Sequence, residues 1–141
     1  MAIYIVDASI VAERLIRGHY TENARAMFNR MGLLDELIVP EFCLIECTNV
    51  IWKHVRYQGM QRSQADLTLR DLRALPLKQA GVKSILSNAL DIGLRHQLAV
   101  YDSLYVALAI RLQVPFISID GPQQRAATAE GVILKPITDF T

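Results

Sequence analysis

The sequence predicts an α/β protein built on one parallel sheet with helices on both faces. Short runs of β-branched and aromatic residues alternate along the chain with longer stretches whose apolar residues recur at helical spacing. Strands joined through helices pair in parallel, and such sheets are covered on both sides. The 141 residues are 52% hydrophobic and 21% charged, which excludes disorder and predicts a single domain over residues 1–141.

The first elements are a strand, two helices and a second strand. The strand is predicted over residues 3–6, where Ile-Tyr-Ile-Val ends at a polar Asp-Ala-Ser. A helix follows at once, with Ser9 as a candidate N-cap. Apolar residues at i, i+3, i+4 and i+7 predict a second helix over 21–34, and a short strand over 37–39 ends at Pro40.

The middle of the chain contains a helix predicted over residues 42–57. Its apolar side chains occupy nearly every side, which predicts packing on more than one face. Trp52 and Tyr57 are therefore interpreted as core residues rather than as partners for nucleic-acid bases. A more charged helix over 63–74 follows, and then a brief edge strand over 75–77, where a proline is tolerated.

The last third of the chain continues the alternation of helices and strands. Its elements are predicted over residues 82–93 and 102–112 (helices) and over 115–120 and 132–134 (strands). The helix over 102–112 is apolar all round, which predicts burial from several sides. Gly121-Pro122 is expected to break the chain after the strand that ends in Asp120.

Charge and cysteine content narrow the function classes. Fifteen basic and fourteen acidic side chains leave a net charge of +1, which excludes binding of nucleic acid by bulk charge alone. No apolar run is long enough to cross a membrane, and Asp7 interrupts the apolar start that a signal peptide needs. Cys43 and Cys47 lie four apart in a predicted helix, which favours two reduced, buried thiols and a cytoplasmic protein.

Four carboxylates lie in unusually apolar surroundings. Asp7 and Asp120 each end a predicted strand, and Glu46 and Asp102 lie in strongly apolar helical segments. The ligand site of a parallel α/β sheet lies outside the carboxyl ends of its strands. A buried carboxylate is costly unless it is paired, hydrogen-bonded or bound to a metal. The sequence therefore predicts a site in which these four side chains take part.

Each carboxylate also has an ordinary structural interpretation. Asp7 can end a strand and cap the next helix, and Asp102 is a favoured N-cap residue. Asp120 can serve as a turn residue beside Gly121-Pro122. Glu46 can pair with a neighbouring cation or face solvent. The four together, all in apolar segments, are less easily explained in this way than any one alone.

A divalent metal is the simplest partner for converging carboxylates. Mutual repulsion would raise their pKa values unless cations compensate, and no basic residue shares the short segments of Asp7, Asp102 and Asp120. All-oxygen ligands select a hard ion, Mg²⁺ or Mn²⁺. Such an ion keeps positions open for water and phosphate oxygens, which is suited to phosphodiester hydrolysis.

The segments that carry these acids resemble the PIN-domain nucleases, and more narrowly the VapC-type toxins of toxin–antitoxin pairs. The resemblance rests on Val-Asp-Ala-Ser at 6–9, Glu46 in its helix, Tyr-Asp-Ser-Leu-Tyr-Val-Ala-Leu-Ala at 101–109 and Ser-Ile-Asp at 118–120. It implies a three-layer α/β/α sandwich with a central, mainly parallel sheet of four or five strands. It also implies Mg²⁺- or Mn²⁺-dependent endoribonuclease activity on RNA, a homodimer and a cognate antitoxin.

The resemblance assigns roles to individual residues. The three main acidic positions of the family are matched by Asp7, Glu46 and Asp102, and the more variable fourth by Asp120, with Ser9 and Ser118 as supporting hydroxyl groups. The family continues after its fourth acid with a short helix-like stretch. This chain has Gly121-Pro122 there instead, so the direct role of Asp120 stays open.

Other polar residues are weaker candidates for the site. Arg14, Lys53 and Arg125 are candidates to contact an RNA backbone, Arg125 the better placed because it follows Asp120, although a solvated helix residue is the simpler interpretation of each. Asn49, three residues after Glu46, could hydrogen-bond to it or to a water in the site.

Two other functions are possible. One is a catalytically inactive PIN-like module for RNA binding or assembly, for which a damaged set of acids would be expected. The other is a phosphatase or phosphotransferase with Asp7 as nucleophile. Enzymes of that type need a second Asp two positions later, where this chain has Ser9.

Overall fold

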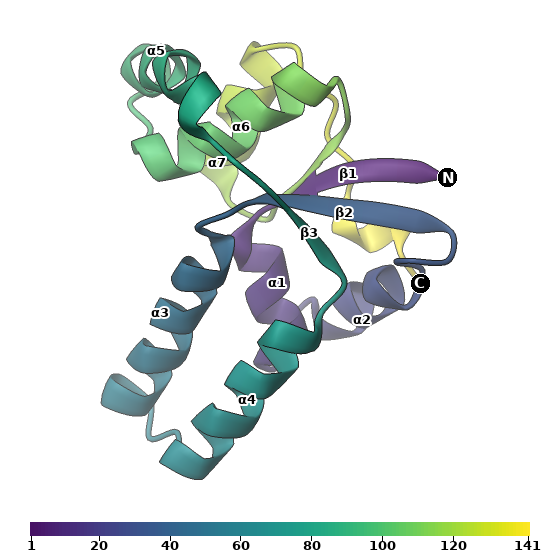
Figure 1. Cartoon of the computed structure of the whole chain (residues 1–141), viewed down its shortest axis with the longest axis vertical. Helices are drawn as coiled ribbons and strands as arrows, with labels where there is room; N and C mark the ends of the chain where they lie inside the picture. Colours follow the sequence, from purple (N-terminus) through teal and green to yellow (C-terminus); the bar gives the residue numbers. More distant parts are fainter.

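The computed structural model describes all residues, 1–141, and has a four-stranded parallel sheet at its centre (Figure 1). The strands are β1 (Ala2–Val6), β2 (Asp35–Pro40), β3 (Leu77–Ala80) and β4 (Phe116–Ile117), in the spatial order β3-β2-β1-β4. Every pairing is parallel, with Tyr4 opposite Leu37 and Ile5 opposite Phe116. The predicted α/β class and parallel sheet are confirmed.

Seven α-helices and two short 3₁₀ turns connect and follow the strands. They are α1 (Ala8–Leu15), α2 (Thr21–Asn29), α3 (Cys43–Tyr57), α4 (Arg62–Ala74), η1 (Lys83–Ile85), α5 (Leu86–His96), α6 (Val100–Leu112), α7 (Gly121–Ala129) and η2 (Ile137–Asp139). Figure 1 shows α1 to α4 on one side of the sheet and α5 to α7 on the other. Right-handed crossovers require this division, because the chain steps from β1 to β3 in one direction and returns to β4 in the other.

The core lies between the sheet and its two helical layers. The inner strand β1 and its neighbour β4 contribute fully buried side chains such as Ile5, Val6 and Phe116. Helix α6 is buried along seven consecutive residues, from Ser103 to Ala109, as its all-round apolar sequence predicts. Helix α6 packs between α5 and the strands β1 and β2.

Three of the predicted strands differ from the structure in length or position. The strand expected over 132–134 is reduced to a single bridge between Leu134 and Phe116, and β4 is only two residues long. After Ile117 the backbone groups of Ser118 and Asp120 bond to the side chains of Gln124 and Ser118 instead of to a strand, and Pro136 has no N–H with which to extend the pairing past Lys135. The edge strand forms at Leu77–Ala80 rather than at 75–77, after Pro76.

Gly121-Pro122 begins a helix instead of only ending a strand. Asp120 is the N-cap of α7, and its side chain accepts a hydrogen bond from the backbone N–H of Gln123 (3.0 Å). Proline is tolerated at the first helical positions because its missing N–H would have no partner there. Helix α7 therefore supplies, directly after Asp120, the helix-like stretch that the family has after its fourth acid.

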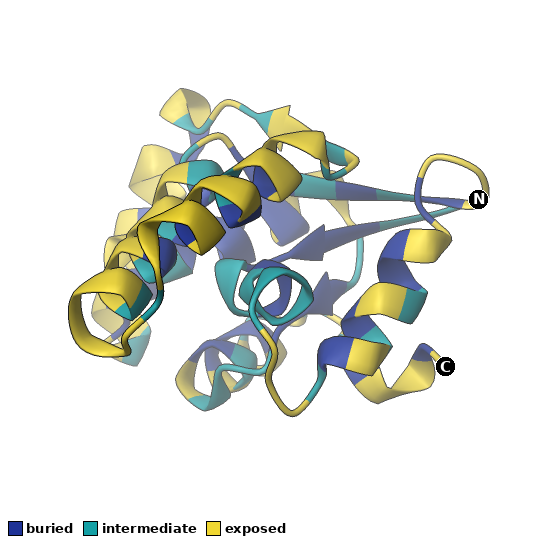
Figure 2. Cartoon of the chain, turned by 90° about the horizontal axis from the view of Figure 1, so that it is seen from below, coloured by how far each residue is buried: buried dark blue, intermediate teal, exposed yellow.

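Helix α3 is not packed on all sides as predicted. Only Cys43, Cys47 and Ile51 are buried, and both cysteines are free thiols. Helices α3 and α4 form a hairpin that projects away from the sheet, and Figure 2 shows much of its surface exposed. The interpretation of Trp52 and Tyr57 as core residues is wrong, because 54% and 65% of their surfaces are exposed. None of the helices has the length and apolarity that a membrane crossing requires.

Candidate active site

The four singled-out carboxylates lie along the edge of the sheet where the strands end. Asp7 directly follows β1, and Asp120 lies three residues after β4. Glu46 is in the first turn of α3, which follows β2, and Asp102 is in the first turn of α6. The parallel order of the strands places these segments at the same edge.

Each carboxylate is also at the N-terminal end of a helix. Asp7 and Asp120 occupy the N-cap positions of α1 and α7, and the other two lie in the first turns of α3 and α6. Helix N-termini carry a partial positive charge and unpaired N–H groups that favour carboxylate and phosphate. The edge is therefore suited to hold negative charge, either from these side chains or from a phosphate ligand.

Asp7 is the most deeply buried of the four, with 5% of its surface exposed. The Ser9 hydroxyl donates a hydrogen bond to its Oδ1 (2.7 Å), so Ser9 contacts the acid side chain instead of capping the helix. Burial raises the pKa of the Asp7 carboxyl to about 7, and the hydrogen bond from Ser9 partly opposes this rise. Desolvation, rather than the expected repulsion between acids, is the main cause.

Glu46 is held by a tyrosine from the opposite side of the sheet. The phenol Oη of Tyr105 donates a 2.6 Å hydrogen bond to Glu46 Oε1. Burial raises the pKa of Glu46, the Tyr105 hydrogen bond lowers it, and repulsion from Asp102 raises it further. Burial also raises the pKa of Tyr105, so the phenol remains a hydrogen-bond donor.

Asp102 and Asp120 are connected through the buried side chain of Gln123. Its Nε2 donates to the backbone carbonyl of Asp102 (3.1 Å), and its Oε1 accepts from the Ser118 hydroxyl (2.8 Å). The Asp120 backbone N–H donates to the same hydroxyl (3.0 Å). Burial raises the pKa of Asp102, and repulsion from Asp120 adds to it. Gln123 therefore fixes the start of α6 relative to the end of β4.

The carboxylates share an edge but are not gathered into one ligand cluster. No three His, Cys, Asp or Glu side chains lie close enough together here to enclose a metal ion. Repulsion acts between neighbouring acids along the edge: Asp102 raises the pKa of Glu46, and Asp120 raises the pKa of Asp102.

The supporting candidates differ in where the structure places them. Ser9 and Ser118 contact the acids or their network, as described above. Asn49 is exposed and makes no hydrogen bond with Glu46. Arg125 is in α7, and its Nη1 lies close over Gly121, next to Asp120. Arg14 is in the last turn of α1, at the end remote from Asp7, so these two residues are not brought together.

Tyr105 and Gln123 are contributors that the sequence interpretation missed. Asp120 and Gln123 have the spacing of a capping box, an acid or hydroxyl followed three residues later by Glu or Gln, which is a readable signal. Tyr105 lies three residues after Asp102 on the same helix face, but nothing local to it indicates a contact with Glu46.

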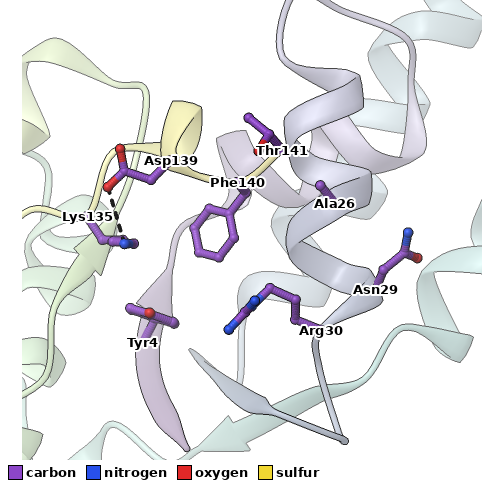
Figure 3. A pocket seen from close by; sticks show the side chains of 8 residues that line it. All are labelled: Tyr4, Ala26, Asn29, Arg30, Lys135, Asp139, Phe140 and Thr141. Carbon is purple, nitrogen blue, oxygen red and sulfur yellow. Dashed lines mark ion pairs between the residues drawn. The ribbon is translucent and has the colours of Figure 1, made fainter.

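A large cavity lies elsewhere and is lined by none of the four carboxylates. It measures about 640 Å³ and is lined by residues of β1, α2 and the C-terminal segment, including Tyr4, Arg30 and Phe140 (Figure 3). Its two cations are already paired, Arg30 with Asp35 (2.7 Å) and Lys135 with Asp139 (3.2 Å). The cavity therefore offers no unpaired cationic side chain to a ligand.

Comparisons with known proteins agree with this geometry. The PIN domain family model matches residues 4–129. A curated relative, Ribonuclease VapC3 of Pyrobaculum aerophilum, is 28% identical over 118 residues, which cover 82% of this chain and 88% of the relative.

Solved structures share the fold at low sequence identity. VapBC2 from Rickettsia felis, bound to a DNA fragment from its promoter, matches with a TM-score of 0.70 and 12% identity, covering 95% of this chain and 98% of that chain. Mycobacterium tuberculosis VapC20, a Sarcin-Ricin loop cleaving toxin, matches with a TM-score of 0.66 and 15% identity over 87% and 94% of the two chains.

Proposed function

This chain belongs to the PIN-domain family, and from that premise we propose that it is a metal-dependent endoribonuclease, the toxin of a toxin–antitoxin pair. The observation that carries the proposal is the placement of Asp7, Glu46, Asp102 and Asp120 at four helix N-termini on one edge of the sheet. The names of the curated relative and of the M. tuberculosis neighbour support RNA as the substrate.

The donor set fits a hard divalent cation. All four side chains offer carboxylate oxygens, and no nitrogen or sulfur ligand competes among them. In our proposal Asp7, Glu46 and Asp102 hold Mg²⁺ or Mn²⁺, and Asp120 assists. The bound cation would activate water and stabilise developing charge on the phosphate oxygens.

The chain's own residues prepare the site for that cation and for RNA. Tyr105 keeps one oxygen of Glu46 in place and leaves the other free. Ser9 orients Asp7, whose Oδ atoms must release their proton before they can act as ligands. Gln123 sets the spacing between Asp102 and Asp120. The helix N-termini attract the scissile phosphate to the same edge.

Partners follow from the same family membership. We propose a cognate antitoxin that covers this edge, a homodimer and a cytoplasmic location. The antitoxin is supported by the likeness to the R. felis VapBC2 structure, whereas the homodimer and the location rest on the resemblance to VapC-type toxins alone.

The test is cleavage and cation binding with matched variants. Purified protein is incubated with structured RNAs and single-stranded DNA in Mn²⁺, Mg²⁺ or EDTA, beside Asp102→Asn and the control Asp91→Asn, an exposed acid on α5. We expect RNA cleavage that requires the cation, is lost in Asp102→Asn and persists in Asp91→Asn.

Titration calorimetry with Mn²⁺ separates an enzyme from an inactive module. Binding that is lost in Asp7→Asn supports the nuclease. If neither cleavage nor cation binding occurs, the alternative, a catalytically inactive RNA-binding or assembly module, replaces it. Cleavage by Asp102→Asn at the wild-type rate would remove Asp102 from the site.

A further inference from the structure

Helix α3 carries an exposed aromatic and basic surface, which we call the α3 track and define as Trp52, Lys53, Arg56 and Tyr57. Large aromatic side chains usually lie in the core, yet more than half of the surface of both Trp52 and Tyr57 is exposed. Lys53 and Arg56 are exposed beside them. Packing between α3 and α4 therefore does not explain why aromatic and basic side chains occur together at these four positions.

The aromatic groups of the α3 track are held in a fixed arrangement. The rings of Trp52 and Tyr57 meet edge to face, with centroids 5.9 Å apart and planes at 88°. The guanidinium Cζ of Arg56 lies 5.1 Å from the centroid of Tyr57. Ordered aromatic rings with a neighbouring guanidinium are the groups on which unpaired nucleic-acid bases stack.

The α3 track lies beyond Glu46 on the same helix, and it leads away from the candidate active site. Lys53 and Tyr57 are seven and eleven residues after Glu46, so all three share one face of α3. At 1.5 Å per residue, Lys53 and Tyr57 lie about 10 and 16 Å from Glu46 along the axis. A stacked strand advances about 3.4 Å per nucleotide, so this length accommodates about five nucleotides.

The charge of the hairpin favours a polyanion. Residues 43–74, which form the hairpin, contain five basic and three acidic side chains, and one of the acids is Glu46 of the candidate site. Arg62 and Arg70 are paired with Asp66 and Asp71. Lys53 and Arg56 have no acidic partner, so their charge is available to a phosphate backbone.

An apolar protein segment is the main competing occupant. Trp52 also lines a cavity of about 280 Å³ between α3 and α4, beside Ile51, Val55 and Leu69. That cavity lies on another side of α3 from the face that Glu46, Lys53 and Tyr57 share. Lys53 and Tyr57 lie on the Glu46 face, and the Arg56 guanidinium lies over the Tyr57 ring, so positive charge and an aromatic surface together favour RNA here.

We propose that single-stranded RNA binds along the α3 track, with bases stacked on Tyr57 and Trp52 and phosphates on Lys53 and Arg56. The strand is thereby led to the carboxylate edge, and an unpaired region is selected over a duplex, whose bases are not free to stack. This inference rests on the proposed ribonuclease function for its substrate class.

The test uses the fluorescence of Trp52, which is the chain's single tryptophan. Full-length protein is titrated with a short oligouridylate and with an RNA duplex. EDTA is present so that binding is measured without cleavage. We expect saturable quenching by the single strand and weaker binding of the duplex. Tyr57→Ala should weaken binding about 5- to 150-fold, the range for loss of one stacking partner.

The salt dependence of binding tests the basic side chains of the α3 track. Lys53→Ala should lower the slope of log affinity against log salt by about 0.7, the loss of one contact to a single strand. The controls are Leu94→Ala and Lys83→Ala, exposed residues of α5 and η1 that lie outside the track. Circular dichroism confirms that each variant is folded.

The outcomes separate this inference from the proposed function. Equal affinity for single strand and duplex, or unchanged binding and cleavage KM in both Tyr57→Ala and Lys53→Ala, would overturn the α3 track even in an active ribonuclease. RNA binding that depends on the track in a protein without cleavage activity would uphold it and remove the enzyme assignment. Quenching by a purified protein partner but not by RNA would assign the surface to that partner.

Discussion

Tyr105 and Glu46 are 59 positions apart in the sequence, and a 2.6 Å hydrogen bond joins their side chains. One residue is in α6 and the other in α3, helices that lie on opposite sides of the sheet. The bond therefore ties the two helical layers together at the edge where the acids lie. It also controls how easily Glu46 becomes a carboxylate, because hydrogen bonding favours the ionised form.

Replacing Tyr105 by phenylalanine tests that control. Tyr105→Phe removes only the hydroxyl, so the pKa of Glu46 should rise further and cation-dependent cleavage should require a higher pH. Stability should fall by about 1 kcal/mol, the net value of one hydrogen bond. The pH profile of cleavage and urea unfolding check both effects. A profile identical to the wild type would show that the bond has no influence on Glu46. Tyr101→Phe, an exposed tyrosine on the same helix, is the matched control.

Asp7→Asn should stabilise the cation-free protein above neutral pH. Burial raises the pKa of Asp7 from 3.8 in its ordinary state to about 7 in the fold. Between these values the unfolded chain loses a proton that the folded chain keeps, so the unfolding free energy falls as pH rises. The penalty is complete above pH 7 and amounts to at most about 4 kcal/mol. Denaturation in EDTA at pH 4 and pH 8 measures it. A variant no more stable than the wild type at pH 8 would contradict the desolvation of Asp7.

Two substitutions at Asp120 separate its capping role from its charge. Asparagine caps helices as well as aspartate does, so Asp120→Asn should keep the stability of α7 and lose cation affinity. Asp120→Ala should lose both, at a cost of about 0.5–2 kcal/mol. Thermal unfolding and Mn²⁺ calorimetry are the measurements. Unchanged cation affinity in both variants would make Asp120 a capping residue only.

Gln123→Met tests the network beneath Asp102. Methionine has a similar volume but leaves the Ser118 hydroxyl and the Asp102 carbonyl without their partner. We expect a loss of about 1–3 kcal/mol in unfolding free energy and weaker Mn²⁺ binding. Gln64→Met, exposed on α4, should change neither. If Gln123→Met binds Mn²⁺ as the wild type does, the spacing of Asp102 and Asp120 does not depend on Gln123.

Local pattern alone predicted much of the fold. The helices, the buried inner strands and their parallel order follow from apolar spacing, because spacing reports which face of a local segment avoids water. The four acids were identified in the same way, since carboxylates in apolar segments demand a partner. Their shared edge follows from the parallel sheet and needs no knowledge of side-chain contacts.

Only the tertiary structure decided which apolar side chains are covered and which distant groups meet. Trp52 and Tyr57 are exposed because α3 and α4 form a projecting hairpin, and a helix can be buried only where neighbours exist to cover it. The contact of Tyr105 with Glu46 depends on how two helical layers meet across the sheet. The missing strand at 132–134 depends on whether β4 is long enough to pair with it. The sequence by itself thus determined the elements and the candidate acids, since both depend on short-range pattern. Contacts, exposure and pairing length required the fold, because they depend on the distances between segments far apart in the chain.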